Sequence, residues 1–102
     1  MVGEPADIVS ETFDWDSQLI EHIARHDVGP ADVESALRNQ ARFFLNLPGR
    51  SATHVMVGRD RWDRVLYVPI LCIDWPDRWR VISAWESRFA RGLLANAGEE
   101  RG

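Results

Sequence analysis

The longest apolar stretch of the chain, Val65 to Ile73, constrains the fold more than any other feature of the sequence. It is much shorter than the ~18 apolar residues that a membrane-spanning helix needs, and it has the length of a strand. A strand with so little alternation between polar and apolar residues is typical of the middle of a sheet. We therefore predict a central strand over Arg64–Ile73, in which Pro69 marks a bulge or a position whose N–H would be exposed.

Further strands are predicted on both sides of this one. The segments Ala41–Leu47 and Ala52–Gly58 are apolar, and the turn signal Pro48-Gly49 separates them. Another strand is predicted over Arg78–Trp85. The short segment Thr12–Trp15 alternates polar and apolar residues, which also suits a strand.

Three segments have the apolar spacing of helices. The first begins after a cap at Asp16 or Ser17, the second spans Pro30 to about Asn39, and the third spans Glu86 to about Ala95. Their apolar stripes are Leu19, Ile20, Ile23 and Ala24; Val33, Ala36 and Leu37; and Phe89, Ala90, Leu93 and Leu94.

This order of elements indicates one α+β domain, in which the helices cover one face of an antiparallel sheet meander. A chain of 102 residues suits a single domain, which we place at residues 13–95 between a flexible lead-in at 1–12 and a polar tail at 96–102. The first ten residues lack the basic residues of a secretory signal, and the single cysteine, Cys72, cannot form an internal disulfide. We therefore expect a cytoplasmic protein with no membrane segment.

The net charge of −4 conceals two halves of opposite sign. Residues 1–37 carry nine acids and one arginine, whereas residues 38–95 carry ten arginines and five acids. Because all twelve basic residues are arginine, Schiff-base chemistry through lysine is excluded, and planar groups suited to phosphate recognition are available. The division predicts either a basic face for an anionic partner or ion pairs between the two halves.

Five short motifs follow one another along residues 13–94. They are Phe13–Asp16, Ala24–Val28, Val33–Ala36, Val55–Arg59 and Arg80–Ala84. In this order and spacing they resemble the motifs of BrnT-type toxins. The resemblance implies a RelE-like fold, ribonuclease activity that blocks translation, and a small antitoxin that neutralises the toxin and represses their operon. The partners it implies are this cognate antitoxin and messenger RNA, free or on the ribosome, with assembly into homo- or hetero-oligomers.

The chain departs from that family pattern at several positions. These departures favour a second hypothesis, a catalytically inactive homologue that binds a protein or RNA. A third is a stand-alone regulator or phage-encoded inhibitor whose acidic first half mimics nucleic acid. The departures are Gln18 in place of lysine, Asp27 in place of glycine, Thr53 and His54 near an expected arginine, Trp85 in place of arginine, and Arg91 and Leu94 near an expected acid and tyrosine.

Metal-independent RNA cleavage needs groups that transfer protons and cations at the phosphorus. We predict that His54 is the acid or base, that Arg59 and Arg80 contact the phosphate, and that Glu86 is a base beside Arg80. His54 is expected to project from the polar side of its strand. Each residue also has a structural interpretation: an inert strand histidine, arginines paired with nearby aspartates, and an acid that caps the last helix.

The remaining candidates concern binding. Arg64 and Arg78 extend an arginine ladder across adjacent strands and are predicted to contact RNA, with Trp62 stacking on unpaired bases. Trp75 and Trp79 are predicted to be exposed anchors for a protein partner.

Two histidines have the spacing of half a zinc site. His22 and His26 are four residues apart on one predicted helix, but no third and fourth ligand are evident. We therefore expect no metal and no cofactor, and we expect His26 to tie the helix end to the sheet.

Overall fold

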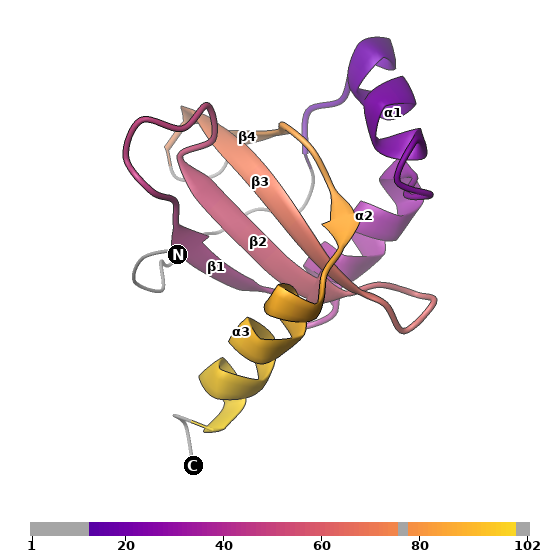
Figure 1. Cartoon of the computed structure of the whole chain (residues 1–102). Coiled ribbons are helices and arrows are strands. Elements are labelled where there is room, and N and C mark those ends of the chain that lie inside the picture. The colour runs from indigo at the N-terminus through magenta and orange to yellow at the C-terminus, as the bar shows by residue number, and fades with distance from the viewer. Residues whose placement is uncertain (1–12, 76–77, 100–102) are drawn as a thin grey trace.

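A computed structural model describes residues 13–75 and 78–99, which form an α+β fold (Figure 1). Three helices accompany an antiparallel sheet of five strands, in the order β1-β2-β3-β4 with β5 also paired to β3. Within these ranges no helix has both the length and the apolar character to cross a membrane. The elements are α1 (Ser17–Ala24), α2 (Pro30–Arg38), β1 (Arg42–Leu45), β2 (His54–Arg59), β3 (Val65–Asp74), β4 (Arg78–Val81), β5 (Trp85–Glu86) and α3 (Arg88–Glu99).

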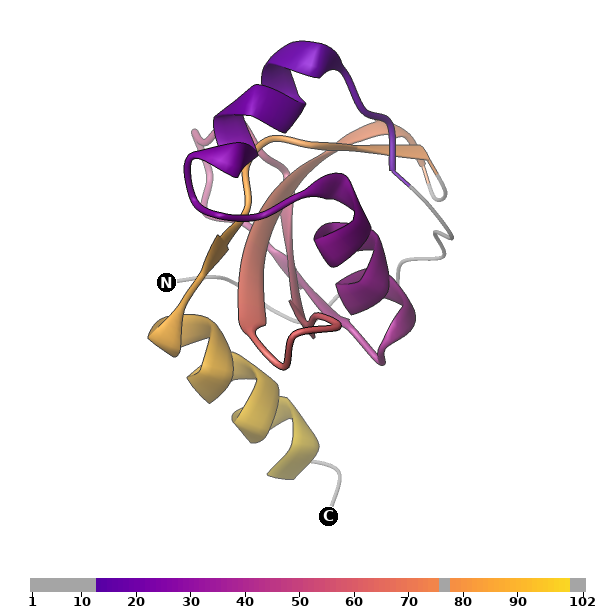
Figure 2. The ribbon, with the colours of Figure 1, turned by 90° about the vertical axis from the view of Figure 1, so that its right-hand side faces the viewer.

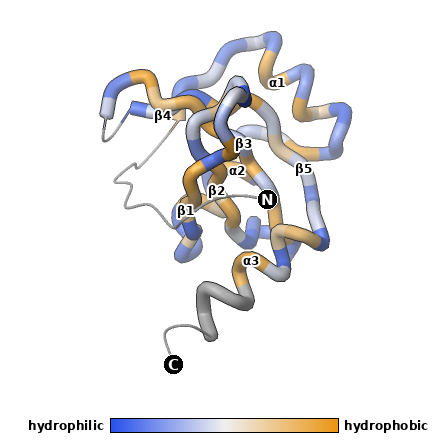
Figure 3. The backbone as a smooth tube through the Cα atoms, turned by 60° about the vertical axis from the view of Figure 1, so that its left-hand side comes forward, coloured by the Kyte–Doolittle hydropathy of each residue, from blue (hydrophilic) through white to orange (hydrophobic). Residues whose placement is uncertain are grey.

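The first two helices begin where the sequence predicts, because local caps fix their starts. The carboxylate of Asp16 accepts a hydrogen bond from the backbone N–H of Leu19 at 2.8 Å and so caps α1. Pro30 occupies the first turn of α2, where no N–H partner is needed. Along α1 hydrophobic and hydrophilic positions alternate (Figure 3), and Leu19 and Ile23 are buried whereas Ile20 is exposed.

The prediction of a central strand is confirmed. β3 pairs with β2 on one side and with β4 and β5 on the other, and Leu66, Val68 and Ile70 are fully buried. The irregularity in this strand falls between Cys72 and Asp74 rather than at Pro69.

The prediction that all helices cover one face of the sheet is wrong. α1 and α2 pack with Met56 and Leu66 in one core, whereas α3 packs through Ala90 against Val55 and Val57 on the opposite face. Figure 2 shows α3 separated from α1 and α2 by the sheet. Alternate residues of β2 point to opposite faces, and the residues from His54 to Gly58 are all buried, so both faces need a cover.

The C-terminal part also differs from the prediction. The strand expected over Arg78–Trp85 is interrupted between β4 and β5. Glu86 lies in β5 and does not begin the helix; instead, the hydroxyl of Ser87 accepts from the N–H of Ala90 at 3.2 Å. α3 continues to Glu99, past the predicted end. Of the strand expected over Thr12–Trp15, a single parallel bridge from Asp14 is present; Thr12 and the lead-in lie outside the described residues.

Candidate functional site

A hollow of about 290 Å³ lies where α1 meets the edge of β4. The N–H of Asp14 donates to the carbonyl of Trp79 at 2.9 Å, and Asp14 forms a parallel bridge with Arg80. These contacts attach the start of α1 to β4. The side chains of Asp16, His22 and Arg80 therefore line the same hollow, although they come from opposite halves of the chain.

Two polar contacts order this hollow. Arg80 forms an ion pair with Asp16, and its side chain stays half exposed. The hydrogen bond from Leu19 holds the pKa of Asp16 below its usual value despite some burial, and Arg80 adds to this effect. The Nε2 atom of His22 lies 3.0 Å from the hydroxyl of Ser83, in the segment between β4 and β5. The hollow thus holds an imidazole, a guanidinium and a carboxylate.

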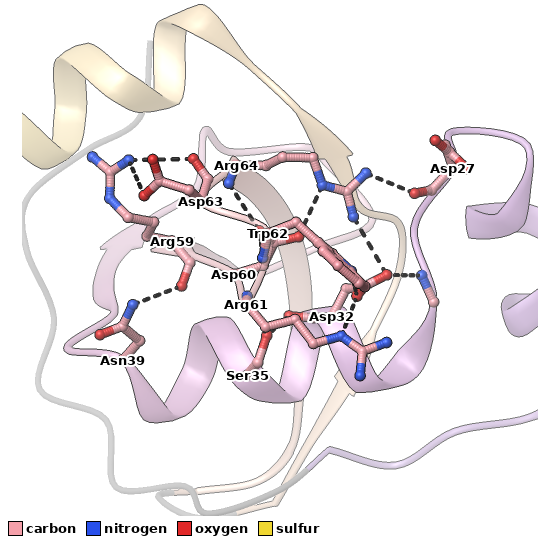
Figure 4. Close-up of polar contacts among 11 residues, drawn as sticks. Asp27, Asp32, Ser35, Asn39, Arg59, Asp60, Arg61, Trp62, Asp63 and Arg64 are labelled. Atoms are coloured by element: carbon pink, nitrogen blue, oxygen red, sulfur yellow. Dashed lines mark hydrogen bonds and ion pairs between the residues drawn. The ribbon is translucent and has the colours of Figure 1, made fainter.

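A separate network around Asp32 holds the side chains of Arg64 and Trp62, which the sequence predicts to contact RNA (Figure 4). Arg64 pairs with Asp60 at 2.9 Å and with Asp32 at 3.3 Å. The same Asp32 carboxylate accepts from Arg61 at 3.0 Å and from the indole of Trp62 at 2.9 Å. Burial alone would raise the pKa of Asp32, but these hydrogen bonds, with that from Gly29, lower it instead. This network joins α2 to the β2–β3 connection.

Among the described residues, ion pairs form between the acidic first half and the basic second half, which is one of the two alternatives that the charge distribution predicted. Arg59 pairs with Asp63 at 3.1 Å, and Arg78 pairs with Asp14 at 3.1 Å. The pairs of Asp14, Asp16 and Asp32 join acids of the first half to arginines of the second, whereas the Arg59–Asp63 pair lies within the second half. The expected ladder does not form, because Arg64 precedes β3 whereas Arg78 lies opposite its far end.

The prediction that His54 projects from the polar side of its strand is wrong. Its side chain is buried, and its ring meets Trp79 edge-on with ring centroids 4.7 Å apart. Burial lowers the pKa of His54. Its ring and Arg80 lie on opposite faces of the sheet, since Trp79, next to Arg80, belongs to the α1–α2 core.

The predicted partner anchors divide into two environments. Trp79 is fully buried and is no exposed anchor, which corrects the prediction. Trp75 is 57% exposed and contacts both Trp79 and His54 through its ring. Trp79 therefore lies in the core that packs against α1 and α2, and Trp75 lies at the surface.

Glu86 does not lie beside Arg80. Glu86 is paired with Leu66 of β3, and Arg80 is paired with Leu71. The separation of five residue steps between these positions corresponds to roughly 16 Å along an extended strand. The structure therefore brings none of His54, Arg59 and Glu86 into the hollow of Arg80.

The residue that the sequence interpretation missed is His22. Its spacing from His26 suggested half a zinc site, and the two rings do meet edge-on at 5.8 Å. Within residues 13–75 and 78–99, no three His, Cys, Asp or Glu side chains are placed to hold a metal ion. The helical spacing of apolar residues could have indicated the position of His22. Because Leu19 and Ile23 of the same helix are buried, His22 lies beside them at the edge of the sheet.

Comparison with known proteins gave no match: no family model fits the chain, no curated protein matches its sequence, and no solved structure matches its fold.

Proposed function

We propose that this protein is a BrnT-like ribonuclease toxin that cleaves RNA at the hollow between α1 and β4. The observation that carries the proposal is that His22 and Arg80 line the same hollow. An imidazole can exchange a proton near neutral pH, and a guanidinium can bind a phosphate through two N–H groups. These two groups supply the base and the phosphate-binding cation for metal-independent cleavage of RNA.

In the proposed reaction, His22 takes the proton of the 2′-hydroxyl while that oxygen attacks the phosphorus. The bond to the 5′-oxygen breaks, and this oxygen leaves with a proton from water. The products are a 2′,3′-cyclic phosphate and a 5′-hydroxyl. Ser83 orients the ring of His22, and Arg80 stabilises the charge that builds up on the phosphoryl oxygens.

One departure from the family pattern supports the resemblance. Asp27 stands where BrnT-type toxins have glycine, and its φ is +62°, in the left-handed region that glycine adopts most readily. Aspartate tolerates this region better than most other residues. The position therefore keeps the backbone conformation that a glycine would serve.

The test is inducible expression in a bacterial host, followed by cleavage of RNA by the purified protein. Arg80→Ala and His22→Ala are expected to lower the cleavage rate by about 100-fold or more, the range for loss of a general acid or base. Arg38→Ala, an exposed arginine outside the hollow, and His26→Ala, one turn away, are matched controls that should retain activity. Equal rates in all four variants would refute the site.

A catalytically silent binding protein is the second candidate, and one observation favours it. Arg80 is already paired with Asp16, so its charge is partly neutralised. Normal growth of the host and intact RNA, with a folded protein, would select this second function.

A further inference from the structure

A second and larger depression, a groove of about 510 Å³, lies on the α3 face of the sheet. Its lining comes from the β1–β2 connection, β3, β5 and the start of α3. Ile82 lines both this groove and the hollow of Arg80, so the two depressions are adjacent. A chain of nucleotides that placed a phosphate in the hollow would therefore extend into the groove.

Aromatic rings form one wall of the groove. Tyr67 and Trp85 have ring centroids 5.1 Å apart and are tilted by 34°, and Phe89 lies 6.0 Å from Tyr67. Phe89 is 49% exposed, although residues of its size are usually covered in a core. In this row of adjacent rings Phe89 is exposed and Tyr67 and Trp85 are half-buried, and unpaired nucleobases stack on aromatic surfaces of this kind.

The charge of the groove favours an anion. Arg50 lines it and forms no ion pair with any residue that the structure describes, whereas no carboxylate lines it among those residues. Burial raises the pKa of Tyr67, and the positive charge of Arg50 opposes this rise. A cation that has no ion pair within residues 13–75 and 78–99 and lies beside aromatic rings is complementary to a ligand that combines an anionic group with a planar base, as a nucleotide does.

We infer that this groove binds a nucleobase of single-stranded RNA next to the cleaved bond, with Trp85 and Phe89 as the stacking rings and Arg50 at the neighbouring phosphate. The inference rests on the proposed ribonuclease function and adds its substrate class, an unpaired strand. Trp85 stands at one of the departures from the family pattern, so the stacking wall is a property of this chain.

Binding is best measured with a probe that cannot be cleaved. A fluorescein-labelled 2′-O-methyl RNA tetranucleotide lacks the free 2′-hydroxyl, and its anisotropy reports affinity. An abasic tetranucleotide carries the same phosphates without bases. Phe89→Ala and Trp85→Ala are expected to weaken the first probe about fivefold or more and to leave the second unchanged.

Charge is tested separately. Arg50→Gln is expected to weaken both probes and to reduce the slope of log affinity against log salt concentration by about 0.7. Arg25→Gln is the matched control, since this side chain is exposed and lies outside the groove. Circular dichroism of each variant confirms folding.

Unchanged affinity in the Phe89→Ala and Arg50→Gln variants would overturn the inference and leave the groove to an apolar side chain of a protein partner. If RNA is still cleaved in that case, the ribonuclease proposal survives alone. If the tetranucleotide binds through the groove but RNA is never cleaved, the groove is supported and the ribonuclease proposal fails.

Discussion

Asparagine in place of Asp32 is expected to destabilise the protein far more than the same change at Asp63. One oxygen of Asp32 accepts a hydrogen bond from the N–H of Gly29 at 2.8 Å and pairs with Arg64. The other oxygen accepts hydrogen bonds from the exposed side chains of Arg61 and Trp62. The asparagine side chain has a single acceptor oxygen. When this oxygen faces one pair of donors, the NH₂ group faces the N–H groups of the other pair and cannot accept from them. The favourable choice keeps Gly29 and leaves Arg61 to water, because the Arg61 side chain is 54% exposed.

The magnitude follows from what cannot be recovered. The bonds from Arg61 and from the indole of Trp62 are lost, and the bond from Arg64, whose side chain is 19% exposed, no longer meets a charged acceptor. Each of these changes costs about 0.5–1.5 kcal/mol. A total loss of about 2–3 kcal/mol corresponds to a decrease in Tm of roughly 8–20 °C for a domain of this size. Asp63 is 83% exposed, so Asp63→Asn should change stability by less than about 1 kcal/mol.

Thermal unfolding followed by circular dichroism at pH 7 measures both variants. Asparagine tolerates the left-handed backbone of Asp63, whose φ is +65°, so the control adds no strain. Equal decreases in Tm, or a loss below about 1 kcal/mol for Asp32→Asn, would contradict the view that this network is a structural joint.

Three further outcomes are expected. Because burial lowers the pKa of His54, its neutral form is favoured in the folded state; stability should be full above about pH 6.5 and fall as the pH drops below it, and Tm profiles should flatten in this range for His54→Phe. Gly58→Ala should cost about 1–3 kcal/mol of unfolding free energy, since the new Cβ would meet a backbone oxygen of α2 at 2.8 Å, whereas Gly92→Ala, with nothing within 4 Å, should gain ~0.5–1 kcal/mol; reversal of this order would refute the packing argument. Asp16→Ser retains a helix-capping side chain but releases Arg80, so RNA affinity should rise in a binding assay while Tm stays close to wild type; a decrease in affinity would show that the carboxylate orients the guanidinium.

Local chemistry made part of the fold predictable. Asp16 and Pro30 mark helix starts through contacts within their own turn, and the apolar run before Asp74 has no alternative to the centre of a sheet. These features depend on neighbours in sequence, which the sequence displays directly.

The candidate site depends on partners that are distant in sequence, and the sequence does not display these contacts. Period-two alternation correctly separated His54 from Val55, but it could not tell that Trp79 would cover the histidine. Arg80 was recognised as a candidate, yet its neighbours Asp16 and His22 lie more than fifty residues away. Only the attachment of α1 to the edge of β4 brings them together.

Because Asp14 forms a bridge with Arg80, the start of α1 cannot attach to the sheet until β4 has been synthesised. The acidic first part of the chain is synthesised before the arginines that pair with Asp14, Asp16 and Asp32. The hollow therefore forms only after the strand that carries Arg80 has been synthesised. A fragment that ends before β4 contains α1 and α2 but lacks one wall of the hollow.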